Sequence, residues 1–264
     1  MSIGLFAGMV VGAAVSLSAF YSISKSMEEN LSDTVILAEV VQNQPPDPEK
    51  YPLPEDLTTD RALIAVYLGD FAGESDNFFI STQEYFQFKQ MGHVRRDWRT
   101  RADAADLVDW VTSDNASVHG IALHLTQDLD NPEAKAQLLL DFVHSHLYDV
   151  EIEFFEDYVR YPLETIIERN GDCEDLAILG AALMKSIGLD VALIKFRPSG
   201  WGESGHLGLA VAGDFSGKYF NINGTKYFYA ESTGTHRRDE ECINKIGEFP
   251  PLLRKRATEV YVVK

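Results

Sequence analysis

Three side chains in the C-terminal half of the chain have the chemistry that acyl transfer requires: Cys173, His206 and Glu231. A thiol can act as the nucleophile, an imidazole as the base that takes its proton, and a carboxylate as the group that orients the imidazole. The local sequence predicts that each residue lies at an end of a helix or a strand. The order cysteine, histidine, acid therefore predicts one nucleophilic site, provided that these elements converge.

The cysteine lies where the sequence predicts the start of a helix. An Asn-Gly pair at residues 170–171 indicates a turn, Asp172 is a good N-cap, and Asp175 stands where a capping residue can reach back. Apolar residues then recur at helical spacing as far as residue 187, and Gly188 suits a helix end. Backbone N–H groups and the helix dipole favour a thiolate in this first turn. The alternative is a small residue that only packs against the core.

The histidine and the glutamate lie at the ends of predicted strands. His206 opens the second strand of a pair that is joined by the glycine-rich loop 199–205. A second pair flanks the Asn-Gly at residues 223–224, a strong signal for a tight hairpin, and Glu231 ends its second arm. The predicted strands are residues 190–196, 206–211, 218–222 and 225–230.

Several blocks around these residues resemble the transglutaminase-like superfamily. The most specific is Gly-Asp-Cys-Glu-Asp at 171–175, which bacterial transglutaminase-like cysteine proteinases share together with Pro-Leu-Glu-Thr at 162–165. The block Tyr-Ala-Glu-Ser-Thr at 229–233 resembles archaeal members, which carry Glu rather than Asp as the third residue. Ala230 and Ser232 depart from the Cys-Glu-Thr-Thr expected there, but the acid itself is kept.

The resemblance, which covers roughly residues 131–250, implies an α+β, papain-like transglutaminase core in which a helix-borne cysteine packs on an antiparallel sheet. It implies that Cys173, His206 and Glu231 form a catalytic triad and that acyl transfer passes through a thioester. Water as acceptor makes a protease or amidase that acts on a protein or peptide and requires no cofactor. An amine as acceptor makes a cross-linking acyltransferase. A catalytically silent binding module, or a structural role for residues 60–127, is the other alternative.

The acids beside the cysteine have two interpretations. Asp172, Glu174 and Asp175 offer hard oxygen ligands, and some bacterial relatives use such residues for calcium. Helix capping and favourable dipole charge are the simpler explanation. Three carboxylates also raise the pKa of a thiol, and we expect an imidazolium at His206 to offset them by pairing with the thiolate. Four other histidines lack the spacing of zinc ligands, and we predict that they are surface or packing residues: His119, His124, His144 and His146.

Composition narrows the class of protein. The chain has 264 residues, of which 45% are hydrophobic and 11% aromatic, as in a folded globular protein. A net charge of −18 argues against nucleic acid or an anionic membrane surface as partner. The two cysteines, Cys173 and Cys242, do not decide the redox compartment, and the oligomeric state stays open.

The N-terminus predicts a membrane anchor. Residues 3–23 carry no charge and are long enough, at about 20 residues, to span a bilayer as a helix. A cleaved signal peptide is the alternative, although no basic residue precedes the apolar run. We expect a single-pass protein of the cell membrane whose soluble part lies outside the cytoplasm.

The chain is therefore predicted to have four parts. An anchor at 1–26 and a stalk with a proline-rich linker at 27–58 precede a helical region at 59–130 and the transglutaminase-like catalytic core at 131–264. The stalk has apolar positions compatible with a helix. Predicted helices in the third part are 81–90, 102–110 and 116–127, and another begins at Asn131 and Pro132.

Overall fold

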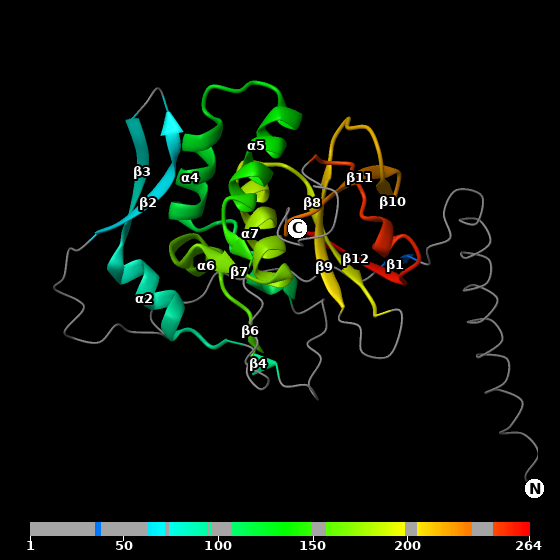
Figure 1. The fold of residues 1–264 in the computed structure, drawn as a ribbon, viewed down its shortest axis with the longest axis horizontal. Coiled ribbons are helices and arrows are strands. Elements are labelled where there is room, and N and C mark those ends of the chain that lie inside the picture. Colours follow the sequence, from blue (N-terminus) through cyan, green and yellow to red (C-terminus); the bar gives the residue numbers. More distant parts are fainter. Residues whose placement is uncertain are drawn as a thin grey trace, which may run out of the picture.

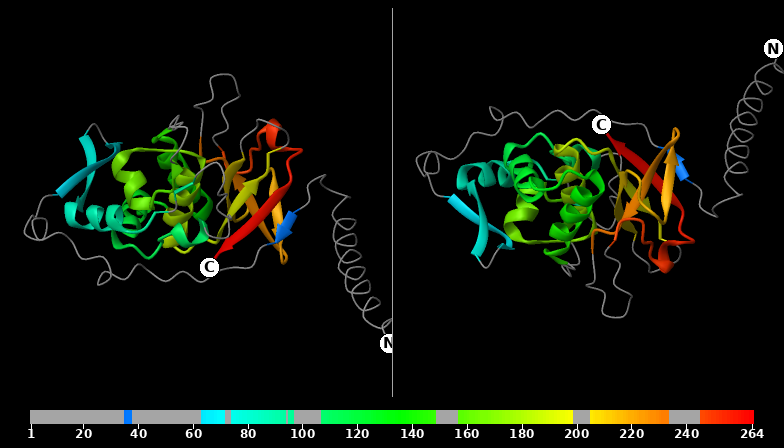
Figure 2. Two further views of the ribbon diagram at one scale, coloured as in Figure 1. Left: turned by 90° about the horizontal axis from the view of Figure 1, so that it is seen from below. Right: turned by 90° about the horizontal axis from the view of Figure 1, so that it is seen from above.

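The part of the chain that positions Cys173, His206 and Glu231 is built from a six-stranded sheet with helices on one side (Figure 1). The computed structural model describes residues 35–37, 63–71, 74–93, 95–96, 107–148, 157–198, 205–233 and 245–264. Figures 1 and 2 show the helices between this sheet and a separate β-hairpin. The described residues thus form an α+β arrangement, as predicted.

The sheet is antiparallel except at one edge. In spatial order its strands are β1 (Val35–Leu37), β12 (Thr258–Val263), β8 (Val191–Phe196), β9 (His206–Ala212), β11 (Thr225–Ala230) and β10 (Tyr219–Ile222), and only β1 and β12 run parallel. The four predicted strands are confirmed. The prediction of a helical stalk is wrong for residues 35–37, because they pair with the C-terminal strand.

The hairpin between β10 and β11 forms as the Asn-Gly pair predicts. Asn223 and Gly224 have φ angles of 52° and 90°, the left-handed pair that a two-residue turn between twisted strands requires. The Asn221 side chain accepts a hydrogen bond from Gly224 N at 3.0 Å. This turn fixes the register of β11 and therefore the position of Glu231, one residue past its end.

The central helix α7 (Cys173–Ser186) packs against β8 and β9 and is buried along most of its length. Gly188, with φ of 87°, ends it as predicted, and Leu189 N donates to Met184 O at 3.1 Å. Three helices pack against α7: α4 (Ala116–Thr126), α5 (Pro132–His144) and α6 (Pro162–Glu168), and α2 (Thr82–Gln90) packs against α6. The predicted caps Ser81 and Asn131 accept backbone N–H groups of α2 and α5.

The region predicted as helical, 59–130, contains a β-hairpin that the prediction missed. Strands β2 (Leu63–Phe71) and β3 (Glu74–Ser81) pair antiparallel, so the helical prediction is wrong for these residues. The physical reason is a period of two: Val66 and Ile80 face the core, whereas Leu63 and Phe79 are 62% and 59% exposed. Helices α2 and α4 are confirmed, but the described end of the predicted helix 102–110 is the short 3₁₀ helix η1 (Val108–Trp110).

One hydrophobic core contains residues from both the predicted helical region, 59–130, and the predicted catalytic core, 131–264. Ile80, Ile121, Leu139 and Leu176 are all buried in the same cluster. The shorter described elements are β4 (Arg95–Arg96) paired with β6 (Asp157–Tyr158), β5 (Leu147–Tyr148) paired with β7 (Asn170–Gly171), and η2 (Pro251–Leu253).

The predicted membrane anchor at residues 1–26 lies outside the described residues. In the part of the chain that the structure describes, no helix combines the length and the apolar character needed to cross a bilayer.

Candidate active site

Cys173 is the first residue of α7, and a capping box fixes the turn on which it lies. The Asp172 side chain accepts the N–H groups of Glu174 at 2.9 Å and Asp175 at 3.2 Å, and Asp175 Oδ2 accepts Asp172 N at 3.3 Å. Strand β7 immediately precedes this turn and pairs with β5. The predicted helix start and both of its capping residues are thus confirmed.

Asp175 also ties this turn to a group of buried charges. Its carboxylate accepts Arg160 N at 2.8 Å and pairs with the Arg160 guanidinium at 2.7 Å, and Arg160 Nε donates to Glu168 at 3.0 Å. Burial raises the pKa of Asp175 to about 6; Arg160 opposes this rise and the Glu174 charge adds to it. A Cβ at Gly171 would lie 2.7 Å from the Asp175 Cβ, so this position requires glycine. We call Arg160, Asp175 and Glu168 the Arg160 network.

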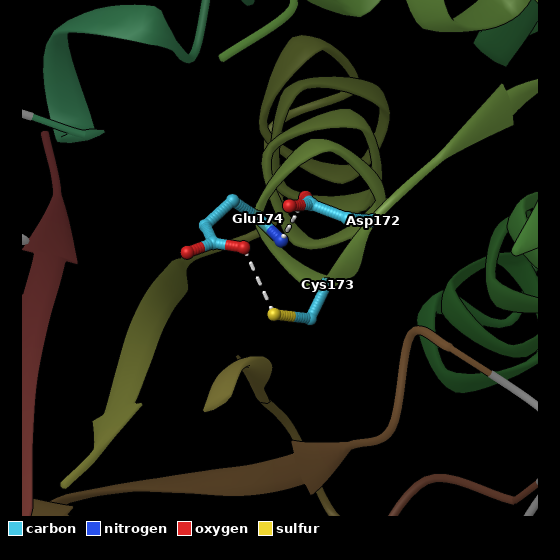
Figure 3. A group of neighbouring side chains, drawn as sticks. All are labelled: Asp172, Cys173 and Glu174. Carbon is cyan, nitrogen blue, oxygen red and sulfur yellow. Dashed lines mark hydrogen bonds between the residues drawn. The ribbon is translucent and has the colours of Figure 1, made fainter. Parts of the chain in front are cut away.

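The Cys173 thiol is nearly buried, at 9% exposure, and donates to Glu174 Oε2 at 2.9 Å (Figure 3). Burial and the charges of Glu174 and Asp172 raise the pKa of the thiol well above its ordinary range, although the Leu207 backbone N–H lowers it. The predicted rise in the pKa of the thiol from the neighbouring carboxylates is confirmed. The expected pairing of a thiolate with an imidazolium stays a prediction, since these effects favour the protonated sulfur in the resting state.

His206 and Glu231 are in direct contact. His206 begins β9 and Glu231 follows β11, and these strands are antiparallel neighbours with Ala230 opposite Leu209. This register puts the two side chains on the same face of the sheet near its end, and His206 Nε2 lies 3.2 Å from Glu231 Oε2. Because the ionised carboxylate can only accept, Nε2 carries the proton, and the neutral ring then has its lone pair on Nδ1.

Glu231 is held by further donors on both carboxylate oxygens. The Tyr229 hydroxyl donates to Oε2 at 2.7 Å, and the Thr233 hydroxyl and N–H donate to Oε1 at 2.8 and 3.1 Å. Burial alone would raise the pKa of Glu231, but the interaction with His206 and these hydrogen bonds outweigh it and lower the pKa far below the ordinary value. His144 Nε2 also donates to the Glu231 backbone carbonyl at 2.6 Å.

The backbone of β9 connects Cys173 with this His206–Glu231 pair. The backbone N–H of Leu207, the residue after His206, lowers the pKa of the Cys173 thiol. The His206 ring stacks on Phe196 with centroids 6.0 Å apart and lies 3.4 Å from the Tyr229 hydroxyl. The structure therefore joins His206 to Glu231 side chain to side chain, whereas among the described residues the Cys173 thiol is hydrogen-bonded to Glu174 and not to His206.

Sequence reasoning missed three residues that hold Glu231. Tyr229 and Thr233 lie two positions before and after the acid, and the period of a strand puts such neighbours on one face, so this spacing could have indicated them. His144 was predicted as a surface or packing residue. It lies 87 positions away in the chain, so no local pattern indicates its bond to Glu231.

A calcium ion fits the acids beside the cysteine poorly. In the described residues, the ligand atoms that lie within 4.8 Å of one another belong to Asp172, Cys173 and Glu174. Calcium takes six to eight oxygen ligands and does not use a thiol. Asp175, the third acid of the hypothesis, is bound to Arg160. The predicted calcium site stays a prediction, and no chemical step below depends on it.

Comparison with known proteins gives only distant matches. No family model and no curated protein sequence matches the chain. A proposed cysteine protease from Cytophaga hutchinsonii is 18% identical with a TM-score of 0.38, over 61% of this chain and 48% of that one. A proposed protease from Parabacteroides distasonis is 12% identical with a TM-score of 0.34, over 70% of this chain and 41% of that one. The matches span less than half of those proteins, and at such TM-scores they decide nothing about this chain.

Proposed function

We propose that this protein is a transglutaminase-like cysteine protease or amidase, with Cys173 as nucleophile, His206 as base and Glu231 as the residue that orients His206. The observation that carries the proposal is the buried His206–Glu231 pair at 3.2 Å, in which His206 begins β9, the strand against which the Cys173 helix packs. This arrangement has the parts of a nucleophile, base and orienting acid. The helix-borne cysteine against an antiparallel sheet supports a papain-like transglutaminase core.

In the proposed reaction, His206 Nδ1 takes the proton from the Cys173 sulfur as the sulfur attacks an amide carbonyl. The oxyanion is stabilised by the Cys173 N–H, since the Asp172 cap accepts the next two N–H groups of the helix. The imidazolium then protonates the amine as the carbon–nitrogen bond breaks, which leaves a thioester. Water, deprotonated by His206, attacks the thioester and releases the acid and the thiol.

The neutral thiol makes proton transfer part of the attack. Because burial and Glu174 keep the proton on sulfur, the nucleophile forms only when His206 accepts this proton. Water is the default acceptor of the acyl group, and we therefore favour hydrolysis over cross-linking of a protein or peptide substrate.

A binding module without turnover is the second candidate function. The observation in its favour is the 9% exposure of Cys173, whose thiol is hydrogen-bonded to Glu174. A thiol that is covered and kept protonated reacts slowly until something displaces the carboxylate.

The test is alkylation of the two cysteines by iodoacetamide, followed by peptide mapping, together with peptidase activity. We expect Cys173→Ala to abolish activity and the labelling of position 173, and Cys242→Ser to leave both intact. Glu174→Gln removes a charge that raises the pKa of the thiol, so we expect Cys173 to label faster at pH 8 in this variant. If Cys173 labels no faster than Cys242 in the wild type and Glu174→Gln does not change that rate, the nucleophile assignment is wrong.

We also propose that the apolar segment 3–23 anchors the protein in the cell membrane with its folded part outside the cytoplasm. The uncharged length of this segment supports the proposal. Alkaline carbonate extraction of membranes should leave the full chain in the pellet, and protease added to intact cells should digest the folded part. Release of a shortened chain into the medium would instead indicate a cleaved signal.

A further inference from the structure

We propose that Tyr229 is a positioning residue of this site: its hydroxyl fixes the Glu231 carboxylate so that His206 keeps its proton on Nε2 and offers Nδ1 to the cysteine. The inference rests on the proposed function, because only acyl transfer requires one particular ring nitrogen of His206 to be basic. It adds to that function a residue that touches the orienting acid rather than the reacting sulfur.

The first support is the contact geometry. Tyr229 is completely buried, and its hydroxyl donates to Glu231 Oε2 at 2.7 Å. The same oxygen lies 3.2 Å from His206 Nε2, and the hydroxyl oxygen lies 3.4 Å from that nitrogen. The three polar atoms therefore form one closed group in which a single carboxylate oxygen serves both donors.

The second support is the path that the Tyr229 ring takes to reach this group. It crosses β9 at Gly208, where a Cβ would lie 2.6 Å from Tyr229 Cε2 and 2.8 Å from the hydroxyl oxygen. Phe196 and Phe249 contact the ring edge-on, with centroids 5.7 and 4.9 Å away. These contacts hold the ring in one position, and this position requires that residue 208 has no side chain.

These contacts define how Tyr229 acts on His206. The hydroxyl proton restrains Oε2, and Thr233 restrains Oε1, so the carboxylate cannot rotate away from Nε2. Without the hydroxyl, Oε2 keeps one donor and gains freedom to turn. The neutral His206 ring then more often carries its proton on Nδ1, where it cannot accept a proton from the thiol.

The test compares Tyr229→Phe with Tyr227→Phe, a buried tyrosine on the same strand and the same sheet face whose neighbouring acid is Asp190. We expect Tyr229→Phe to lower kcat about tenfold to a hundredfold with KM changed less than twofold, since one hydrogen bond to a charged group is lost. We expect Tyr227→Phe to change neither constant by more than twofold.

A second measurement determines the tautomer of His206 directly and does not need turnover. Imidazole ¹⁵N shifts distinguish the two neutral tautomers, with the His206 signals assigned from a His206→Gln variant. We expect wild type and Tyr227→Phe to show protonated Nε2, and Tyr229→Phe to show a larger fraction with protonated Nδ1. An inactive wild type with this tautomer change would reject the proposed function but support the positioning role.

Gly208→Ala provides a variant that keeps the hydroxyl but displaces the ring that carries it. We expect it to shift the His206 tautomer in the same direction as Tyr229→Phe, whereas Gly92→Ala, which meets nothing within 4 Å, should not. Thermal unfolding identifies any variant that does not fold. Unchanged tautomer in folded Tyr229→Phe, with kcat within twofold of wild type, would overturn the proposal.

Discussion

Glu231 and Asp175 are both buried carboxylates that accept hydrogen bonds from a nitrogen-bearing side chain, yet their pKa values are shifted in opposite directions. The pKa of Glu231 is lowered far below its ordinary value despite burial, whereas burial raises the pKa of Asp175 to about 6. Glu231 belongs to the group that orients His206, and Asp175 belongs to the Arg160 network behind the cysteine.

The difference lies in the neighbours of each carboxylate. Glu231 accepts from His206, from two hydroxyls and from one backbone N–H, and no second acid is among the groups that shift its pKa. Asp175 has Arg160 as its cation, but the Glu174 carboxylate lies close enough to oppose its charge. Burial penalises both charges, and only a complete set of donors outweighs that penalty.

The comparison separates two uses of a buried acid. At Glu231 a permanently charged carboxylate keeps one histidine proton in place, which is what an orienting group must do. At Asp175 a carboxylate with a raised pKa serves to fix a helix start and a neighbouring loop. We therefore expect changes at Glu231 to reduce activity and changes in the Arg160 network to reduce stability.

The largest expected effect is on activity, from Glu231→Gln. The amide NH₂ group can face His206 Nε2 in place of a carboxylate oxygen, which favours the tautomer with its proton on Nδ1. The value of kcat should therefore fall about 10³-fold to 10⁴-fold. Glu259→Gln, a change at another buried glutamate bonded to Arg197 and Tyr261, should leave kcat unchanged even if it lowers the melting temperature. Steady-state kinetics on both variants checks this contrast, and equal losses of kcat would break it.

Arg160→Gln should produce the largest loss of stability. It leaves the Asp175 carboxylate without its cation, and breaking a buried pair costs about 3 to 5 kcal/mol. We expect the lower end, because a carboxylate whose pKa is already about 6 can take up a proton. Urea unfolding at pH 7 measures the change. Lys185→Gln is the control, since its pair with the 67% exposed Asp190 should contribute about 1 kcal/mol at most.

The pH dependence of stability should have opposite signs at the two acids. A folded-state pKa raised from 3.8 to about 6 means that the stability from Asp175 is lost as the pH rises through this interval, by roughly 3 kcal/mol. The lowered pKa of Glu231 contributes stability above the ordinary 4.5 that is lost as the pH falls below it.

Urea unfolding between pH 3 and pH 7 covers part of both intervals and therefore distinguishes the two acids. Relative to wild type, the free energy of unfolding of Asp175→Asn should increase as the pH rises, and that of Glu231→Gln should decrease. The same sign of slope for both variants would contradict the assigned charge states.

The smallest expected effect comes from Thr233→Val. The variant removes the hydroxyl that donates to Glu231 Oε1 at 2.8 Å but keeps the N–H donor, so kcat should fall about tenfold. Ser232→Ala is the matched control, because within the described residues the Ser232 hydroxyl has no hydrogen-bond partner. A loss at Ser232→Ala as large as at Thr233→Val would show that the whole segment, rather than the Thr233 hydroxyl, supports Glu231.

Local chemistry was sufficient to predict the ends of the elements that carry the site. The Asp172 capping box, the Asn-Gly turn at 223–224 and the caps at Ser81 and Asn131 are all interactions within a few residues, and each is present in the structure. Prediction failed for the hairpin of β2 and β3, where short apolar runs do not distinguish a strand from a helix.

The sequence by itself determined which side chains stand at a helix start, a strand start and a strand end, because capping and turn formation depend on neighbours in the chain. Only the tertiary structure decided the charge of the Cys173 thiol and of the Glu231 carboxylate. The thiol is neutral because burial and the Glu174 charge raise its pKa. Glu231 is ionised because the hydrogen bonds from His206, Tyr229 and Thr233 lower its pKa. Glu174, Tyr229 and Thr233 are near in the chain, but the burial of both groups and the contact of Glu231 with His206 depend on segments distant in sequence, and these quantities set a pKa.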